Sequence, residues 1–363
     1  KYGFELLMWG DMFFRLAGGD YFTNFNQDPE LGEIPEKIKQ LVPENVQLVY
    51  WDYFSREQQR YEKNIDAHNA IKSESWFAGG LWTWAGLAPH NAFAIATMRE
   101  AMRACRAKGV ENVVMTMWGD NGAECSKFAV LPALFMVAQM ARGIDDEETI
   151  RANFEKEFGI PFEDFRALDL AGTQNDSAEA IYNPEKYLLY CDPFMGQFDN
   201  RVKPADAAGY ADCAARLAVY ADHAEYGYLF RSLRALCAFL SVKADLGIRT
   251  RAAYLSGDKK AAKALCTDYD AALERLDVFY AAYEQQWMHE NKPQGFDVVD
   301  LRIGGQRQRL LHCRDRLLAY AEGRLDRIEE LEEPVLDCCC EEKADGQATR
   351  AIFWHEIASA NVI

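Results

Sequence analysis

The feature that most constrains this chain is the alternation of short apolar runs with helical patterns over its first 145 residues. Each run is short enough for a buried strand, and each is followed by a segment with apolar residues at helical spacing. Repeated units of this kind imply parallel strands joined by crossover helices. They fit either half of a (β/α)8 barrel or one open sheet. The predicted strands cover residues 4–8, 46–50, 76–84 and 113–117.

The ends of these predicted strands carry the same chemistry. Each strand finishes in an aromatic residue and, in three of the four, an acid: Trp9 with Asp11, Tyr50 with Asp52, Trp82 with Trp84, and Trp118 with Asp120. In a barrel the carboxyl ends of parallel strands converge on one pocket. The pattern therefore favours half of a (β/α)8 TIM barrel, with residues 113–117 as a strand covered on both faces.

After residue 145 the pattern changes to long helical stretches. These are predicted at about 147–158, 204–226, 229–255, 258–289 and 303–322. The predicted domains are therefore a barrel half over 1–145, an α-helical domain over 146–335, and a tail over 336–363 that docks on the body. Gly304 and Gly305 are predicted to allow a close approach between the two domains.

Charge and cysteine content exclude several kinds of partner. The chain has 40 Lys and Arg against 57 Asp and Glu, a formal net charge of −17, which repels nucleic acid. No apolar run is long enough to span a membrane. The ten cysteines show no CxxC pair and no Cys/His metal spacing, so no metal or other cofactor is expected. Cys105, Cys213 and Cys237 fall within helical patterns, which suggests buried thiols in the cytoplasm.

The tryptophans and acids at the strand ends suit a carbohydrate. Indole faces stack on the C–H surfaces of sugar rings, and carboxylates accept hydrogen bonds from hydroxyl groups. At any single position a structural role is the alternative, with a tryptophan closing the core or an aspartate capping a helix. The recurrence at four strand ends favours a binding site. Its predicted walls are Trp9, Trp51, Trp82, Trp84 and Trp118, and its acceptors are Asp11, Asp52 and Asp120.

Several of these segments resemble a known family. The runs MWGDM (8–12), VYWDYF (49–54), GGLWTWAG (79–86) and MWGDNGAE (117–124) resemble the second half of the catalytic (β/α)8 TIM barrel of glycoside hydrolase family 20, the β-N-acetylhexosaminidases. The runs YNPEKYLLYCDPFMG (182–196) and ENKPQGFDVVDLRIGG (290–305) resemble a bacterial subgroup in which a helical domain follows the barrel. The resemblance covers nearly the whole chain.

The resemblance implies an exo-acting, retaining enzyme that removes a terminal β-linked N-acetylglucosamine or N-acetylgalactosamine. In this family the 2-acetamido oxygen of the substrate attacks C1 and forms an oxazolinium ion. An adjacent Asp-Glu pair orients the acetamido group and supplies the general acid/base. That pair follows the fourth barrel strand, which is expected upstream of Lys1. The segment given is therefore expected to be inactive by itself.

The resemblance also implies roles for individual residues. Trp9 and Trp118 would wall the acetamido methyl group, with Trp51, Trp82 or Trp84 as the third wall. Tyr50 would polarise the acetamido oxygen, and Tyr53 is the alternative. Asp52 belongs to the same Tyr-x-Asp pattern, and Asp120 would bind the O4 and O6 hydroxyls of the sugar.

Two other readings remain open. One is a sugar-binding module or fragment without catalysis, and the other is an open-sheet α/β protein with an unrelated small-molecule function. A second copy of the chain is a candidate partner. His68 and His90 are expected to have structural roles.

Overall fold

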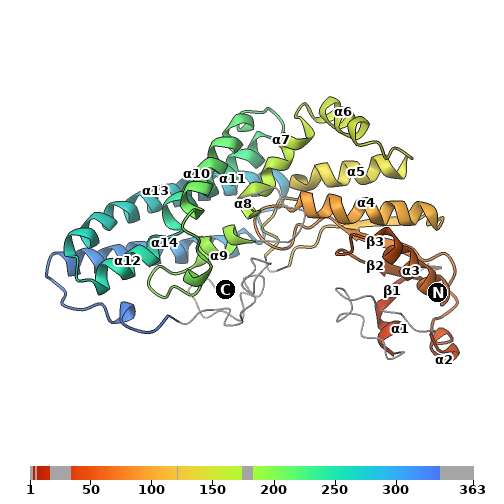
Figure 1. Ribbon diagram of the computed structural model, residues 1–363, viewed down its shortest axis with the longest axis horizontal. Coiled ribbons are helices and arrows are strands. Elements are labelled where there is room, and N and C mark those ends of the chain that lie inside the picture. The colour runs from red at the N-terminus through yellow and green to blue at the C-terminus, as the bar shows by residue number, and fades with distance from the viewer. Residues whose placement is uncertain (1–2, 5, 17–33, 121, 174–182, 336–363) are drawn as a thin grey trace. The chain divides into compact units, whose positions relative to one another are not determined.

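The computed structural model describes residues 3–4, 6–16, 34–120, 122–173 and 183–335 (Figure 1). Contacts divide the chain into two compact units. Unit 1 comprises Lys1–Trp82, Asn91–Trp118 and Val130–Asp164, and unit 2 comprises Thr83–His90, Gly119–Ala129 and Phe165–Ile363. The predicted domains are continuous segments with boundaries at residues 145 and 335. That division stays a prediction. The predicted tail at 336–363 lies outside the described residues.

Unit 1 contains a parallel sheet of four strands in the order β1-β2-β3-β4. Trp9 lies opposite Val49 in the β1/β2 ladder, and Trp51 lies opposite Ala78 in the β2/β3 ladder. All carboxyl ends therefore lie at the same edge of the sheet, and the predicted mixed α/β class is confirmed. The strands are β1 (Leu6–Trp9), β2 (Val46–Trp51), β3 (Trp76–Gly80) and β4 (Val113–Thr116).

Helices of unit 1 pack on this sheet and on one another. Helix α3 contacts β2, α4 contacts β3 and α3, and α5 contacts α4 (Figure 1). Helix α4 buries the apolar residues Phe93, Met98, Met102 and Cys105, because these residues recur on one face. The helices are α1 (Asp11–Leu16), α2 (Glu36–Lys39), α3 (Gln58–Asn69), α4 (Asn91–Ala107), α5 (Leu131–Ala141) and α6 (Glu147–Phe158), which has the predicted bounds.

The two outer strands correct two predictions, that residues 4–8 form a buried strand and that residues 113–117 are covered on both faces. Leu6 and Leu7 of β1 are each 48% exposed, and Val114 of β4 is 39% exposed. The central strands are buried, with Leu48 and Ala78 fully inaccessible. The reason is position in the sheet, since an outer strand pairs with only one neighbour among the described strands.

Strand β3 ends at Gly80, four residues earlier than predicted. Trp82 has a φ of 50°, in the left-handed region, which takes the backbone out of the extended conformation. Trp82 and Trp84 therefore lie in the connection that follows the strand rather than within it. A non-glycine residue in this conformation is uncommon and stores strain of the kind found at binding sites.

Unit 2 is helical. Helix α11 packs against α10 and α13, and α13 packs against α14. The predicted helix over 229–255 is interrupted at Ala244–Asp245, and the one predicted from 303 begins earlier, at Phe296. The main helices are α8 (Leu170–Thr173), α9 (Pro184–Tyr190), α10 (Asp206–Leu217), α11 (Gly227–Lys243), α12 (Leu246–Leu255), α13 (Lys259–Glu290) and α14 (Phe296–Ala321). The 3-10 turns η3 (Ala167–Asp169), η4 (Asp199–Arg201), η5 (Ala218–Tyr220) and η6 (Glu329–Leu331) lie in unit 2, whereas η2 (Lys127–Val130) and α7 (Phe162–Arg166) cross the unit boundaries.

Two further expectations concern unit 2 and its helices. No atom beyond its own helix lies within 4 Å of a Cβ built on Gly304, and the close approach expected between the two domains stays a prediction. Among the described residues, none of the helices combines the length and the apolar character needed to cross a bilayer.

Candidate functional site

Trp9 and Trp118 meet at the carboxyl edge of the sheet, within unit 1. Trp9 ends β1 and Trp118 follows β4, and their ring centroids are 6.3 Å apart with planes tilted by 54°. Both indoles remain accessible, with exposures of 40% and 42%. Two large aromatic rings that touch each other and still face solvent are the arrangement expected of a ligand wall rather than of a closed core.

Tyr53 joins the tryptophans into one cluster. The indole Nε1 of Trp118 donates to the Tyr53 hydroxyl over 3.0 Å, and the indole Nε1 of Trp82 donates to the Tyr53 carbonyl over 2.9 Å. The ring of Trp51 lies 5.1 Å from the Tyr53 ring. We call Trp9, Trp51, Tyr53, Trp82 and Trp118 the aromatic cluster, and all five residues belong to unit 1.

Asp11 orients one member of the aromatic cluster. Its Oδ1 accepts a hydrogen bond from Trp51 Nε1 over 3.2 Å, and its Oδ2 lies 4.0 Å from Arg15 Nε. Asp11 is in the first turn of α1 and is largely buried. Asp11 is predicted from the sequence to accept hydrogen bonds from sugar hydroxyls. In the structure it accepts one from the indole N–H of Trp51, which holds that ring in place.

Tyr50 points into the core instead of toward the aromatic cluster. It is 1% exposed, and its ring lies 4.9 Å from His68 and 5.5 Å from Phe77. Its hydroxyl donates to Asp52 Oδ2 over 2.9 Å and accepts from Asn64 Nδ2 over 3.0 Å. Of the two tyrosines considered from the sequence, the structure therefore brings Tyr53 together with the indoles.

Asp52 is likewise part of the core of unit 1. Besides the Tyr50 bond, its Oδ1 accepts the backbone N–H groups of Phe54 and Ser55 over 2.9 and 3.1 Å, which fastens the turn after β2. Burial raises the pKa of Asp52, and these hydrogen bonds together with Arg60 act in the opposite direction. A carboxylate enclosed in this way shapes the turn that carries Tyr53.

Two predicted site residues, Trp84 and Asp120, belong to unit 2, whereas the aromatic cluster belongs to unit 1. Trp84 is buried in the segment after β3, and Asp120 is exposed in the turn that follows Trp118. Six predicted residues, in contrast, form one set of contacts within unit 1: Trp9, Asp11, Trp51, Tyr53, Trp82 and Trp118.

Comparison with protein families gives the context of this geometry. Residues 161–350, slightly more than half of the chain, match the family profile described as Glycoside Hydrolase 20C C-terminal domain. The chain belongs to glycoside hydrolase family 20. The predicted family is thereby confirmed. The matched region covers the helical part of the chain, whereas the aromatic cluster lies before it. No curated protein matches the chain.

A buried group of charges in this family 20 chain was missed by sequence reasoning. The carboxylate of Glu124 lies 2.7 Å from Lys186 Nζ and 3.1 Å from Arg302 Nη1, and it accepts from Tyr190 Oη over 2.7 Å. Burial by itself would raise the pKa of Glu124, but the two cations hold it below its usual range. The available signal was an acid in the run 117–124 and a lysine in the run 182–196.

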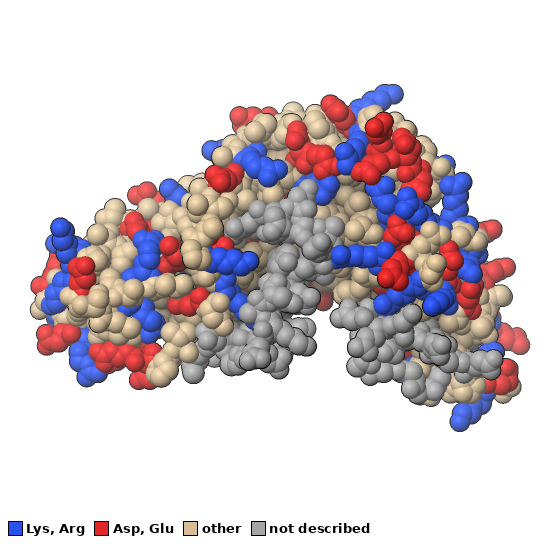
Figure 2. Space-filling model, in the orientation of Figure 1, with Lys and Arg blue, Asp and Glu red and all other residues tan. Residues whose placement is uncertain are grey.

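Possible metal ligands, surface charge and cysteines in this family 20 chain also bear on the predictions. No group of three potential His, Cys, Asp or Glu metal ligands occurs in the parts of the chain that the structure describes. On the face drawn in Figure 2, the described acidic and basic side chains are intermixed, without a continuous basic stripe. Cys105, Cys213 and Cys237 are buried thiols, as predicted.

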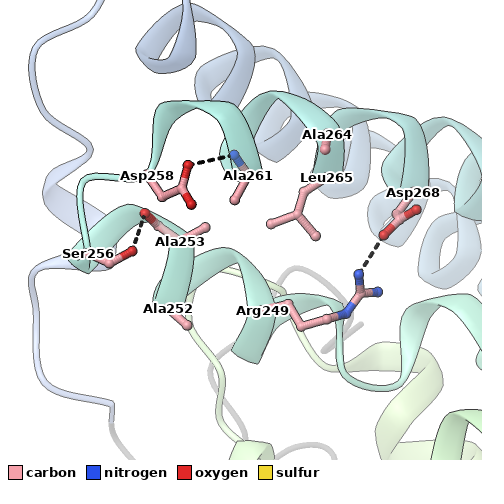
Figure 3. A pocket seen from close by; sticks show the side chains of 9 residues that line it. All are labelled: Arg249, Ala252, Ala253, Ser256, Asp258, Ala261, Ala264, Leu265 and Asp268. Carbon is pink, nitrogen blue, oxygen red and sulfur yellow. Dashed lines mark hydrogen bonds and ion pairs between the residues drawn. The ribbon is translucent and has the colours of Figure 1, made fainter.

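An open groove of about 670 Å³ lies along α12 and α13 (Figure 3). Its charged side chains already bind one another or a helix end. Arg249 lies 2.5 Å from Asp268, and Asp258 accepts the N–H of Ala261 at the start of α13. The groups that could bind a ligand are thus committed to helix packing, so the groove adds no second site.

Proposed function

We propose that the aromatic cluster forms the acetamido-binding wall of an exo-acting β-N-acetylhexosaminidase. Such an enzyme hydrolyses terminal β-linked N-acetylglucosamine or N-acetylgalactosamine with retention. The observation that carries the proposal is the contact set around Trp118, whose ring lies against Trp9 and whose Nε1 bonds to Tyr53. It supplies flat apolar walls and a hydroxyl at one place, which is what an N-acetyl group needs. Membership in family 20 supports the same reaction class.

The proposal includes the barrel. A sheet of parallel strands in the order β1-β2-β3-β4, with helices α3 and α4 between consecutive strands, supports half of a (β/α)8 barrel. An open doubly wound sheet reverses its strand order at a switch point, and the four described strands contain no such reversal. The aromatic cluster then lies at the carboxyl edge, where barrel enzymes bind their substrates.

In the proposed mechanism the substrate supplies its own nucleophile. The acetamido oxygen attacks C1 while a general acid protonates the leaving oxygen and its bond to C1 breaks, and the same group then takes a proton from the water that opens the oxazolinium ion. Walls that hold the acetamido group near C1 confer a high effective molarity, up to about 7–11 kcal/mol of barrier in the best intramolecular cases. Among the residues of this chain, the proposed role of Trp9 and Trp118 is to exclude water and restrict rotation of that group.

We assign the polarising hydroxyl to Tyr53 in place of Tyr50. The Tyr53 hydroxyl accepts a hydrogen bond from Trp118 Nε1, so it lies at the indole wall where the acetamido group is proposed to bind. The Tyr50 hydroxyl is enclosed between Asp52 and Asn64. The Asp-Glu acid/base pair is assigned by the resemblance to the strand before β1, so this chain is proposed to supply binding and positioning.

Titration calorimetry of the full chain with N-acetylglucosamine thiazoline tests the proposal. This compound resembles the cyclised intermediate, and glucose is the ligand control. We expect the thiazoline to bind and Trp118→Ala to weaken binding at least about tenfold, roughly the 1.4 kcal/mol that one lost stacking wall represents. Trp287→Phe, which changes an indole of unit 2, should leave the affinity unchanged.

The outcomes separate the competing functions. Failure of the wild-type chain to bind thiazoline would reject the acetamido wall and favour an unrelated α/β function. We expect no turnover of p-nitrophenyl N-acetyl-β-glucosaminide by residues 1–363. Rapid turnover would show that an acid/base lies within this chain and that its assignment upstream is wrong. Binding without turnover, in a longer chain that contains the preceding strand, would instead identify a sugar-binding module.

A further inference from the structure

Helix α9 contacts both of the loops that leave β3 and β4. These are loop 83–90 and loop 119–129, and both belong with α9 to unit 2. Asn183 Nδ2, at the N-cap of α9, donates to the carbonyl of Ala85 over 3.0 Å. Glu185 Oε1 accepts the N–H groups of Leu87 and Ala88 over 3.0 and 3.2 Å. Three positions of loop 83–90 are therefore bound by two side chains of one helix end.

The next residue of α9 binds the other loop. Lys186 Nζ lies 2.7 Å from Glu124 Oε2, and Tyr190 at the end of α9 donates to Glu124 Oε1 over 2.7 Å. The loops are also joined directly, because Lys127 Nζ donates to Thr83 Oγ1 over 3.0 Å. Glu185 and Lys186 are thus adjacent in sequence but serve different loops, which explains why an acid and a base stand side by side in a buried helix.

The other end of α9 is fixed to the helical bundle. Lys243 of α11 donates to the carbonyls of Leu188 and Cys191, the latter over 2.6 Å. Gln306 of α14 also donates to Cys191 O, over 3.4 Å. Directly after α9, Asp192 forms an ion pair with Arg309 of α14 over 2.5 Å. A short helix that would be marginal alone is therefore held by α11 and α14.

We propose that α9 is a positioning clamp, in which Asn183, Glu185 and Lys186 fix the backbone of loops 83–90 and 119–129. The clamp stands on contacts within unit 2, and only its consequence for sugar binding rests on the proposed function. That consequence arises because loop 83–90 carries Trp84 and loop 119–129 carries Asp120. The clamp residues are positioning residues that act on a substrate only through these loops.

The backbone of loop 83–90 passes close to Glu185 at Gly86. A Cβ built on Gly86 would collide with Glu185 Oε1, so the missing side chain lets the loop reach the carboxylate. Glu185 and Lys186 are both buried. A buried acid or base without its partner is strongly destabilising, so these side chains favour the loop conformation that pairs them.

Hydrogen exchange measured by mass spectrometry on the full chain tests the clamp. We expect Glu185→Ala to speed exchange in peptides covering 83–90 at least about tenfold, while peptides from α13 keep their wild-type rates. Glu185→Gln keeps an acceptor oxygen of the same shape and should restore most of the protection. Glu274→Ala, an exposed acid on α13, is the control and should change neither region.

Two results would overturn the clamp. One is unchanged protection of loop 83–90 in Glu185→Ala, and the other is equal acceleration in every peptide, which would indicate a general loss of stability. If Glu185→Ala does not fold, Asn183→Ala removes the bond to Ala85 and carries the same comparison with a smaller expected increase. No acceleration in that variant would likewise reject the clamp.

The second loop is tested with the Glu124–Lys186 pair. Lys186→Met should speed exchange over 119–129, and the variant is expected to fold because Glu124 keeps Arg302 as its buried counter-ion. Equal loop exchange in the variant and wild type would contradict the clamp. Faster loop exchange with unchanged thiazoline affinity would uphold the clamp and reject Trp84 and Asp120 as binding residues. Absence of thiazoline binding in the wild type would reject the proposed function alone.

Discussion

The indole N–H of Trp118 donates a hydrogen bond to the Tyr53 hydroxyl over 3.0 Å, between residues 65 positions apart in the chain. The bond crosses from the end of β4 to the turn after β2, past the intervening strand β3. It fixes the orientation of an otherwise accessible indole. A ligand wall built in this way has little rotational freedom to lose on binding, which favours affinity.

Tyr53→Phe and Tyr50→Phe should have different effects. Removing the Tyr53 hydroxyl leaves Trp118 Nε1 without this acceptor, so thiazoline affinity should fall about tenfold with only a small loss of stability. Removing the buried Tyr50 hydroxyl breaks bonds to Asp52 and Asn64 and should lower the free energy of unfolding by about 1–2 kcal/mol. Calorimetry and urea denaturation measure the two quantities. The reverse pattern would return the polarising role to Tyr50.

Asp52→Asn should destabilise unit 1. The carboxylate accepts bonds from the Tyr50 hydroxyl and from two backbone N–H groups, and an amide turns one acceptor into a donor. We expect a loss of about 1–3 kcal/mol in the free energy of unfolding, measured by urea denaturation. Asp66→Asn is the control, because Asp66 pairs with Lys108 at an exposed site and should cost about 0–1 kcal/mol. Equal effects would contradict the assigned role of Asp52.

His68 should make unit 1 sensitive to acid. It is fully buried, with its ring 4.5 Å from Phe14 and its Nδ1 2.7 Å from Asn64 O, and burial lowers its pKa to about 4. The unfolded chain therefore binds a proton below about pH 6.5 that the folded chain takes up only near pH 4. Stability should fall by up to about 3 kcal/mol as the pH drops through this window.

The measurement for His68 compares the pH dependence of the free energy of unfolding in His68→Gln and the wild type. The variant should lose this acid-induced decrease. His90 in unit 2 has a pKa lowered by burial to about 4 as well and provides an internal comparison. A His68→Gln variant with the wild-type slope would show that His68 is not enclosed in the neutral form.

Glu185 should have the opposite pH dependence. Burial raises the pKa of its carboxyl to about 7, with the backbone bonds to Ala88 and Leu87 opposing the shift. The folded chain then keeps a proton that the unfolded chain releases near pH 4.5, so stability falls as the pH rises from about 4.5 to about 7. Glu185→Gln cannot ionise, and its stability relative to the wild type should rise over that interval. A constant difference would contradict the prediction.

Gly10→Ala should disrupt the start of unit 1. A Cβ at Gly10 would lie 2.5 Å from His68 Cδ2, too close for any heavy-atom contact, and Gly10 N also donates to Val49 O. We expect a loss of about 1–3 kcal/mol, measured by thermal denaturation. Gly304→Ala is the matched control. Gly304 lies inside α14 with open space at its Cβ, so alanine there should add about 0.5–1 kcal/mol.

Regular local patterns were predictable from the sequence. The alternation of strands and helices foretold the parallel sheet, and the helical pattern over 147–158 foretold α6, which the structure shows capped by Asp146 and ended by Gly159. These features depend on neighbours within one or two turns of the chain, which the sequence displays directly. Family membership could be inferred for the same reason, since its motifs are contiguous runs.

Irregular and distant relationships could not be predicted. Side chains alternate between the two faces of the sheet along β2, and this alternation sends Tyr50 into the core. It does not continue into the following turn, where Tyr53 accepts the hydrogen bond from Trp118. The left-handed backbone at Trp82 ends β3 early, and no local rule indicated it. Glu124 and Arg302 are 178 positions apart in the chain, so only the folded structure shows that they form a buried ion pair.

The sequence by itself thus determined the types and order of the main elements and which residues stand at the ends of β1, β2 and β4. The tertiary structure decided which tyrosine joins the indoles, which strands are exposed, and which loops α9 holds. The physical reason is the range of the forces involved. Backbone preferences act between near neighbours, whereas burial and charge pairing depend on which distant segments the fold brings into contact.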